Sequence, residues 1–163
     1  MKKNNKNNKG FSLVELIIVI AIMAILIGVL APQYLKFVER SRQSTDKQNV
    51  DEIVRAIEIY AADPSADPKV ANDGTGTAVT LTTTGLTIGS GTNADAFGAA
   101  LGAAGIGSYT AGTGGAAGTY TADSTKLKSS VWGNVTLTFK VDSDGNVKVT
   151  ASCSATGAPN ILE

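Results

Sequence analysis

The sequence predicts an α+β protein in which one long N-terminal helix packs on a small antiparallel β-sheet. An apolar run fills residues 11–30, and an amphipathic pattern follows it as far as residue 61. Farther along, residues 131–151 alternate apolar and polar side chains on both sides of a turn-rich segment. Because a helix with one apolar stripe and a sheet with one apolar face each need a partner, the two should cover one another.

The apolar run has the length of a membrane span. As a helix, residues 11–30 cover roughly 30 Å, which is the thickness of the hydrocarbon core of a bilayer. Four lysines precede the run, at positions 2, 3, 6 and 9, so we expect the N-terminus in the cytoplasm and the rest of the chain outside. A secretory signal would carry its small-residue cleavage site after a shorter apolar run. A plain signal anchor is the alternative, and it leaves Glu15 without a role.

Glu15 is an acidic residue inside this apolar run. A charged side chain at the centre of a membrane span costs roughly 2.5–3.5 kcal/mol, and somewhat less toward an end. The carboxylate is therefore expected to have a partner.

The segment Gly-Phe-Ser-Leu-Val-Glu, residues 10–15, follows a short cationic leader and closely resembles the N-terminus of type IV pilins and pseudopilins. The resemblance implies that a prepilin peptidase cuts between Gly10 and Phe11 and methylates the new N-terminus at Phe11. It also implies that Glu15 acts in assembly, and Pro32 stands where the family commonly has a helix-breaking proline. The resemblance covers about the first fifty residues, and beyond them it rests on architecture alone.

Cleavage would create a partner for Glu15, because the uncharged amide nitrogen of Phe11 becomes a cationic amine. At a separation of about 4 Å and an effective dielectric constant near 20, such a pair gains about 4 kcal/mol in Coulomb energy, enough to offset the cost of burial. Within one helix the two groups could meet as an i,i+4 pair. In a filament the carboxylate could instead meet the amine of a neighbouring subunit, and the resemblance implies this second arrangement.

The expected organisation is a cleaved leader over residues 1–10, a helix over residues 11–61, and a β-rich globular domain over residues 62–163. Pro64 should stop the helix. The outer half of the helix carries a stripe at i, i+3, i+4 and i+7 spacing that is suited to covering a sheet, and an opposite charged face that should stay solvated. The stripe consists of Val50, Ile53, Val54, Ile57 and Tyr60, and the charged face of Asp51, Glu52, Arg55 and Glu58.

Gly28 and Pro32 mark the expected weak point, or helix break, of the rod. Proline removes an internal hydrogen bond and clashes with the carbonyl four residues earlier, and glycine is a poor helix former. We expect a kink in the isolated subunit, and local melting in an assembled fibre stays open.

The region from residue 63 to residue 130 is rich in Gly, Ala, Thr and Ser, and we expect it to be loop-rich. Residues 77–84 and 85–88 are predicted strands, and Asn93 is expected to cap a short helix over residues 94–104. Residues 105–118 are expected to form an exposed loop. Residues 131–151 predict an antiparallel hairpin whose apolar face packs on the helix.

The residue inventory disfavours catalysis and cofactors. The chain has no histidine and one cysteine, Cys153, so the usual Ser-His-Asp, Cys-His and zinc sites are excluded, and Cys153 should be a partly buried apolar residue. No phosphate-binding loop is present. The turn at Asp142 and Asp144 faintly resembles a calcium loop, but Ala151 stands where that loop needs glutamate, which favours a hairpin turn.

The charge balance disfavours nucleic acid as a partner. The first ten residues hold four of the fourteen basic residues, so the mature chain would carry ten basic against fourteen acidic residues. An excess of negative charge opposes binding driven by bulk charge, although a local patch of Arg40, Arg42 and Lys47 stays open.

These features lead to one functional hypothesis. The chain is expected to be a structural subunit of a type IV pilus, anchored in the cytoplasmic membrane as a precursor and polymerised into a helical surface filament for adhesion or motility. Its expected partners are its own copies, the prepilin peptidase, a membrane assembly platform and an extension ATPase. A pseudopilin of a type II secretion or competence DNA-uptake system is the alternative, and a membrane-tethered enzyme is a more distant one.

Overall fold

The computed structural model describes residues 12–110, 118–122 and 125–162. The chain divides into two compact units, residues 1–40 and residues 41–163. Helix α1, Leu13–Ala62, contributes to both units. We call residues 13–40 of α1 the N-terminal segment and residues 41–62 the C-terminal segment.

The end of α1 agrees with the sequence prediction. The helix closes where the amide of Asp63 donates to the carbonyl of Tyr60 at 3.2 Å, one residue before Pro64. Proline has no amide hydrogen and disfavours a helical residue before it, so it sets this boundary.

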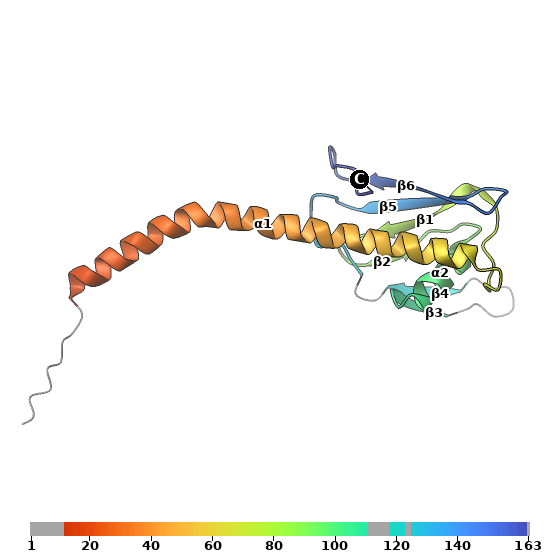
Figure 1. The fold of residues 1–163 in the computed structure, drawn as a ribbon, viewed down its shortest axis with the longest axis horizontal. Coiled ribbons are helices and arrows are strands. Elements are labelled where there is room, and N and C mark those ends of the chain that lie inside the picture. Colours follow the sequence, from red (N-terminus) through yellow and green to blue (C-terminus); the bar gives the residue numbers. More distant parts are fainter. Residues whose placement is uncertain (1–11, 111–117, 123–124, 163) are drawn as a thin grey trace, which may run out of the picture. The chain divides into compact units, whose positions relative to one another are not determined.

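The main sheet lies in the second unit and is antiparallel throughout. Its strands are β1 (Asp73–Leu81), β2 (Leu86–Ile88), β5 (Val135–Val141) and β6 (Val147–Cys153), in the order β2-β1-β5-β6 (Figure 1). The predicted hairpin is confirmed, because β5 pairs with β6 and Phe139 lies opposite Val149. Every second residue of β5 is buried, as the alternation predicted.

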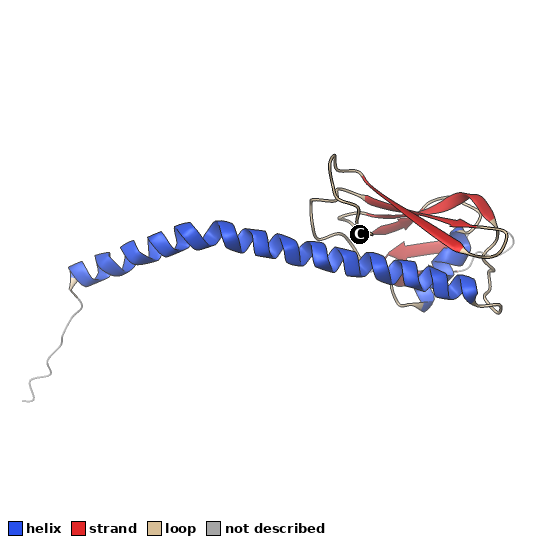
Figure 2. Cartoon of the chain, turned by 45° about the horizontal axis from the view of Figure 1, so that its top comes forward, coloured by secondary structure: helices blue, strands red, loops and turns tan. Residues whose placement is uncertain are grey.

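A smaller layer completes the second unit. It contains α2 (Ala94–Ala103) and a two-stranded sheet of β3 (Gly107–Thr110) and β4 (Thr119–Ala122) (Figure 2). The expectation of a loop over residues 105–118 is therefore wrong for β3, while residues 111–117 lie outside the described residues. A β-carbon on Gly98 of α2 or on Gly118 would collide with the ring of Tyr109, so these glycines let β3 pack closely.

Asn93 has a different role from the predicted cap. It precedes α2, but its side chain makes no capping hydrogen bond. Its Oδ1 instead accepts a hydrogen bond from the amide of Ala71 at 2.7 Å, and its Nδ2 donates to the carbonyl of Ala71 at 2.9 Å. A buried amide side chain is best satisfied by a full pair of backbone groups, and this long-range pairing competes with the local cap.

The core forms between the C-terminal segment of α1, the main sheet and α2. Val50, Ile53 and Ile57 are fully buried, and Val54 and Tyr60 pack beside them, as the stripe predicted. Phe97 of α2 meets Phe139 of β5 edge to face, with ring centroids 5.3 Å apart. The charged face of Asp51, Glu52, Arg55 and Glu58 is exposed, also as predicted.

Asp46 fixes the C-terminal segment of α1 to the chain segment that precedes β5. Its side chain is fully buried, and its two carboxylate oxygens accept hydrogen bonds from the amides of Lys128 and Ser129, each at 2.8 Å. These amides belong to the chain that leads into β5. Hydrogen bonds to a charged acceptor are stronger than neutral ones, so the pair locks the helix against this segment.

Replacing Asp46 with alanine should lower the free energy of unfolding by about 2–4 kcal/mol, because the buried amide of Ser129 and the part-buried amide of Lys128 lose their acceptor. Urea unfolding of the full chain in detergent micelles would measure the change. Asp51→Ala, on the exposed face of the same helix, is the matched control and should stay within about 0.5 kcal/mol of the wild type. Equal stability of the two variants would show that Asp46 does not hold the helix.

Candidate functional site

The N-terminal segment of α1 presents an unusually apolar surface. Every residue from 12 to 37 is exposed, including Leu13 at 72%, Ile25 at 68% and Phe37 at 67%. By length and composition α1 is the one helix among the described residues that could cross a membrane. Contiguous apolar surface of this extent on a protein marks a site of interaction with lipid or with other protein.

Ser12 and Glu15 close the first turn of α1. The amide of Ser12 donates to Oε2 of Glu15 at 2.9 Å, and the amide of Val14 donates to Oγ of Ser12 at 3.4 Å. The first bond is the return half of a capping box, and the second is an N-cap bond to the second residue of the helix. Both satisfy amides that have no partner within the helix. The carboxylate of Glu15 therefore has a local hydrogen-bond donor inside its own chain.

Sequence reasoning missed this role of Ser12. The signal was present, because serine followed three residues later by glutamate before an apolar run is the sequence pattern of a capping box. Gly10 and Phe11, the predicted cleavage site, lie outside the described residues.

Helix α1 runs without interruption through Gly28 and Pro32, and the expected kink at this point stays a prediction. The two residues are four apart, so the carbonyl of Gly28 would normally accept a hydrogen bond from the amide at position 32. Pro32 has no amide hydrogen, so this carbonyl has no helical donor. A β-carbon at Gly28 would meet no atom within 4 Å. One missing hydrogen bond next to an open, side-chain-free position leaves the helix intact but locally weaker.

The turn between β5 and β6 is built around Asp142. Its Oδ1 accepts hydrogen bonds from the amides of Asn146 at 2.9 Å and Asp144 at 3.0 Å, and its Oδ2 accepts from the side chain of Asn146 at 3.4 Å. The hydrogen bond from Asn146 is the main cause that lowers the pKa of Asp142. The carboxylate is thus engaged in shaping a hairpin turn.

Cys153 ends β6 and is half-buried against the core. Burial raises the pKa of its thiol above the usual value. It packs as a small apolar residue, as predicted.

Comparison with known proteins identifies the N-terminal region. Residues 5–31 match the model of the prokaryotic N-terminal methylation motif. The N-terminus of the chain thus carries a prepilin-type methylation motif. This prepilin motif contains Glu15, Gly28 and the start of α1.

Two curated relatives match over 69 residues each. The chain is 38% identical to prepilin peptidase-dependent protein A of Clostridium perfringens, and the match covers 41% of this chain and 49% of that protein. It is 36% identical to the type IV major pilin protein PilA of Myxococcus xanthus, over 42% of this chain and 31% of that protein. The chain thus spans half or less of the length of these relatives, and no solved structure matches it.

Replacing Pro32 with alanine should strengthen the middle of the prepilin helix, because a new amide can donate to the carbonyl of Gly28. We expect slower amide hydrogen exchange over residues 29–36 in micelles. Gly28→Ala is the matched control: it raises helix propensity by up to about 1 kcal/mol without adding a donor. A larger slowing in Gly28→Ala than in Pro32→Ala would contradict the view that the missing donor is what weakens this point.

Proposed function

We propose that this chain is the repeating structural subunit of a type IV pilus. The observation that carries the proposal is the continuous exposed apolar surface of residues 12–37, which belongs to a helix with a prepilin motif at its start. Such a surface is stable in two environments, the hydrocarbon core of a bilayer and a bundle of identical helices. A subunit that is stored in the membrane and then polymerises uses both.

Processing prepares the helix for polymerisation. The prepilin peptidase cleaves between Gly10 and Phe11, removes the leader of residues 1–10, and methylates the nitrogen of Phe11. The new terminus carries a positive charge four residues before Glu15. In the filament the carboxylate of Glu15 forms an ion pair with the positively charged terminus of a neighbouring subunit. This ion pair fixes the axial register of the two helices.

The hydrogen bond from Ser12 to Glu15 is compatible with this pairing. It uses Oε2 of the carboxylate, and a carboxylate has two oxygens with about four acceptor positions. A capped Glu15 is held at the helix start, where the positive end of the helix dipole also favours a negative charge. The hydrogen bond from Ser12 thus holds the carboxylate of Glu15 in place before it pairs with the amine of a neighbouring subunit.

The location and the partners follow from the same scheme. The precursor spans the cytoplasmic membrane once, with its lysine-rich N-terminus inside and residues 41–163 outside. A membrane platform extracts it and an extension ATPase supplies the energy, because the sequence contains no phosphate-binding loop of its own. The second unit is displayed on the filament surface, and its role is structural and not catalytic.

Deletion of the gene tests this function directly. Electron microscopy of the deletion strain should show loss of surface filaments, and complementation with the intact chain should restore them. Unchanged filaments together with a defect in protein secretion or in DNA uptake would assign the chain to the pseudopilins instead.

The charge of Glu15 can be separated from its capping role. Glu15→Gln keeps a side-chain oxygen for the amide of Ser12 but loses the charge, whereas Ser12→Ala loses part of the cap and keeps the charge. Because the ion pair is worth about 4 kcal/mol at a separation of about 4 Å, filament yield should fall at least tenfold in Glu15→Gln. Ser12→Ala should assemble nearly normally, since a lost cap costs about 1 kcal/mol.

Immunoblots of sheared filaments and of membranes would measure both yields. The Glu15→Gln subunit should accumulate in the membrane in its processed form. Normal filaments from Glu15→Gln, or a larger defect in Ser12→Ala, would contradict the charge-pairing role.

A further inference from the structure

Two hollows on α1 carry opposite charge. The first lies in the N-terminal segment, has a volume of about 160 Å³, and is lined by Gln33, Lys36, Phe37 and Arg40. All four residues are exposed. Its two ionisable side chains are both cations, and they flank the ring of Phe37. We call it the basic hollow.

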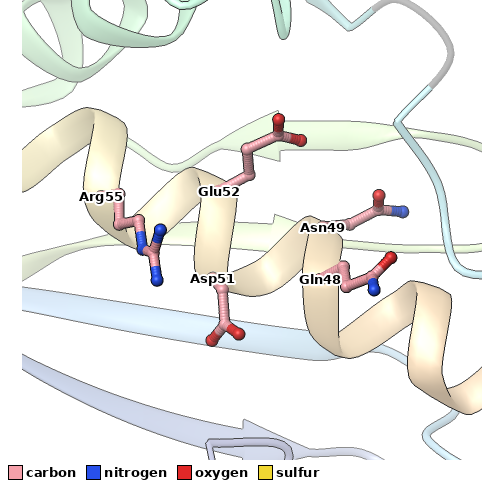
Figure 3. Close-up of a pocket in the computed structure, with 5 residues that line it drawn as sticks. All are labelled: Gln48, Asn49, Asp51, Glu52 and Arg55. Atoms are coloured by element: carbon pink, nitrogen blue, oxygen red, sulfur yellow. The ribbon is translucent and has the colours of Figure 1, made fainter.

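The second hollow lies in the C-terminal segment and has a volume of about 380 Å³. Gln48, Asn49, Asp51, Glu52 and Arg55 line it, and Figure 3 shows their side chains leaving successive turns of α1. The lining contains two carboxylates and one guanidinium, so its net charge is negative. Glu58, one turn farther along the helix, is also exposed. We call the hollow together with Glu58 the acidic band.

The carboxylates of the acidic band are exposed and do not pack into the core of the second unit. The opposite face of this helix segment supplies the buried side chains of Val50, Ile53 and Ile57, and the one buried carboxylate of the segment, Asp46, is satisfied by backbone amides. Asp51, Glu52 and Glu58 are exposed. Exposed charges on one face of a helix that packs on its other face are free to meet another molecule.

We propose that the basic hollow of one copy of this chain docks against the acidic band of a neighbouring copy. The inference rests on the proposed function, because polymerisation through α1 brings helices of identical chains together. A contact between two different surface patches of identical subunits is heterologous, and it builds an open helical filament when the rotation between neighbours does not close into a ring. Opposite charge on the two patches favours this contact over the contact of each patch with its own copy.

The contact adds specificity to an otherwise unspecific apolar interface. Apolar side chains pack in many registers, whereas like charges that face each other across an interface cost several kcal/mol. The two patches therefore select one relative placement of neighbouring helices, in addition to the one set by Glu15. Phe37 contributes apolar area in the basic hollow, where the stems of Lys36 and Arg40 can lie along its ring.

Charge reversal tests the contact. Lys36→Glu with Arg40→Glu makes both patches acidic, and Asp51→Lys with Glu52→Lys and Glu58→Lys makes both patches basic. Each variant alone should give at least about tenfold fewer filaments, because every neighbour contact is then repulsive. Expression of both variants in one cell should restore filaments that contain both chains, and so should all five substitutions in a single chain.

Matched charge changes on the second unit serve as controls. Lys69→Glu with Lys126→Glu, and Asp144→Lys, alter exposed residues outside α1 and should leave the yield unchanged. Failure of the co-expressed variants to rescue one another would overturn the proposal. Loss of yield in the Lys36 and Arg40 variant alone, with normal yield in the acidic-band variant, would also overturn it and would point to phospholipid headgroups as the partner of the basic hollow.

A second measurement does not depend on long filaments. Arg40→Cys and Glu52→Cys chains, each with Cys153→Ser, are co-expressed and treated in intact membranes with a short bis-maleimide. We expect a cross-linked dimer that contains one chain of each kind and is absent when either chain is expressed alone. If cells with the wild-type chain make no pili but the two cysteine variants still form this heterodimer, the pilus proposal is refuted and the contact is retained. Absence of the heterodimer would refute the contact.

Discussion

Apart from Glu15, residues 13–30 of α1 expose only apolar side chains and one glycine, and the burial of such a surface away from water is strongly favourable. Residues 12–37 find no cover within the described chain, whereas residues 41–62 bury one stripe against the sheet and α2. The two halves of the helix therefore differ: one buries its apolar side chains within the folded chain, and the other leaves them exposed. The second half buries its apolar stripe by folding, and the first half presents a surface of the kind that interacts with lipid or with other protein.

In the proposed filament, charged residues set the register in which such helices pack. Apolar packing alone holds helices together without fixing their register, because it is not directional. In the proposed filament, Glu15 at the start of the helix and the basic and acidic patches farther along it supply the direction. The carboxylate of Glu15 is held by its hydrogen bond with Ser12, and Asp46 anchors the C-terminal segment of α1 within the second unit. In the proposed function, the polar groups of α1 therefore divide between folding and assembly.

The sequence was most informative where a periodic pattern is long. The span of α1, its buried stripe and the β5–β6 hairpin were all predicted, because each repeats its apolar residues over several turns or strand positions. Strand β3 has only four residues and gives no such pattern, and its packing depends on the fit of Tyr109 against α2. Asp46 and Asn93 bond to partners far away in the sequence, so local rules assigned Asn93 a cap and Asp46 no role. The processing site at Gly10 and Phe11 rests on the motif alone.

Mass spectrometry of the mature N-terminus is the most direct test of how Glu15 gains its partner. The extracellular form should begin at Phe11 with a methylated nitrogen, and Gly10 replaced by a bulky residue should leave an uncleaved precursor in the membrane. An extracellular form that still begins at Met1 would carry an uncharged amide at Phe11. It would contradict the claim that cleavage supplies the positive charge for Glu15.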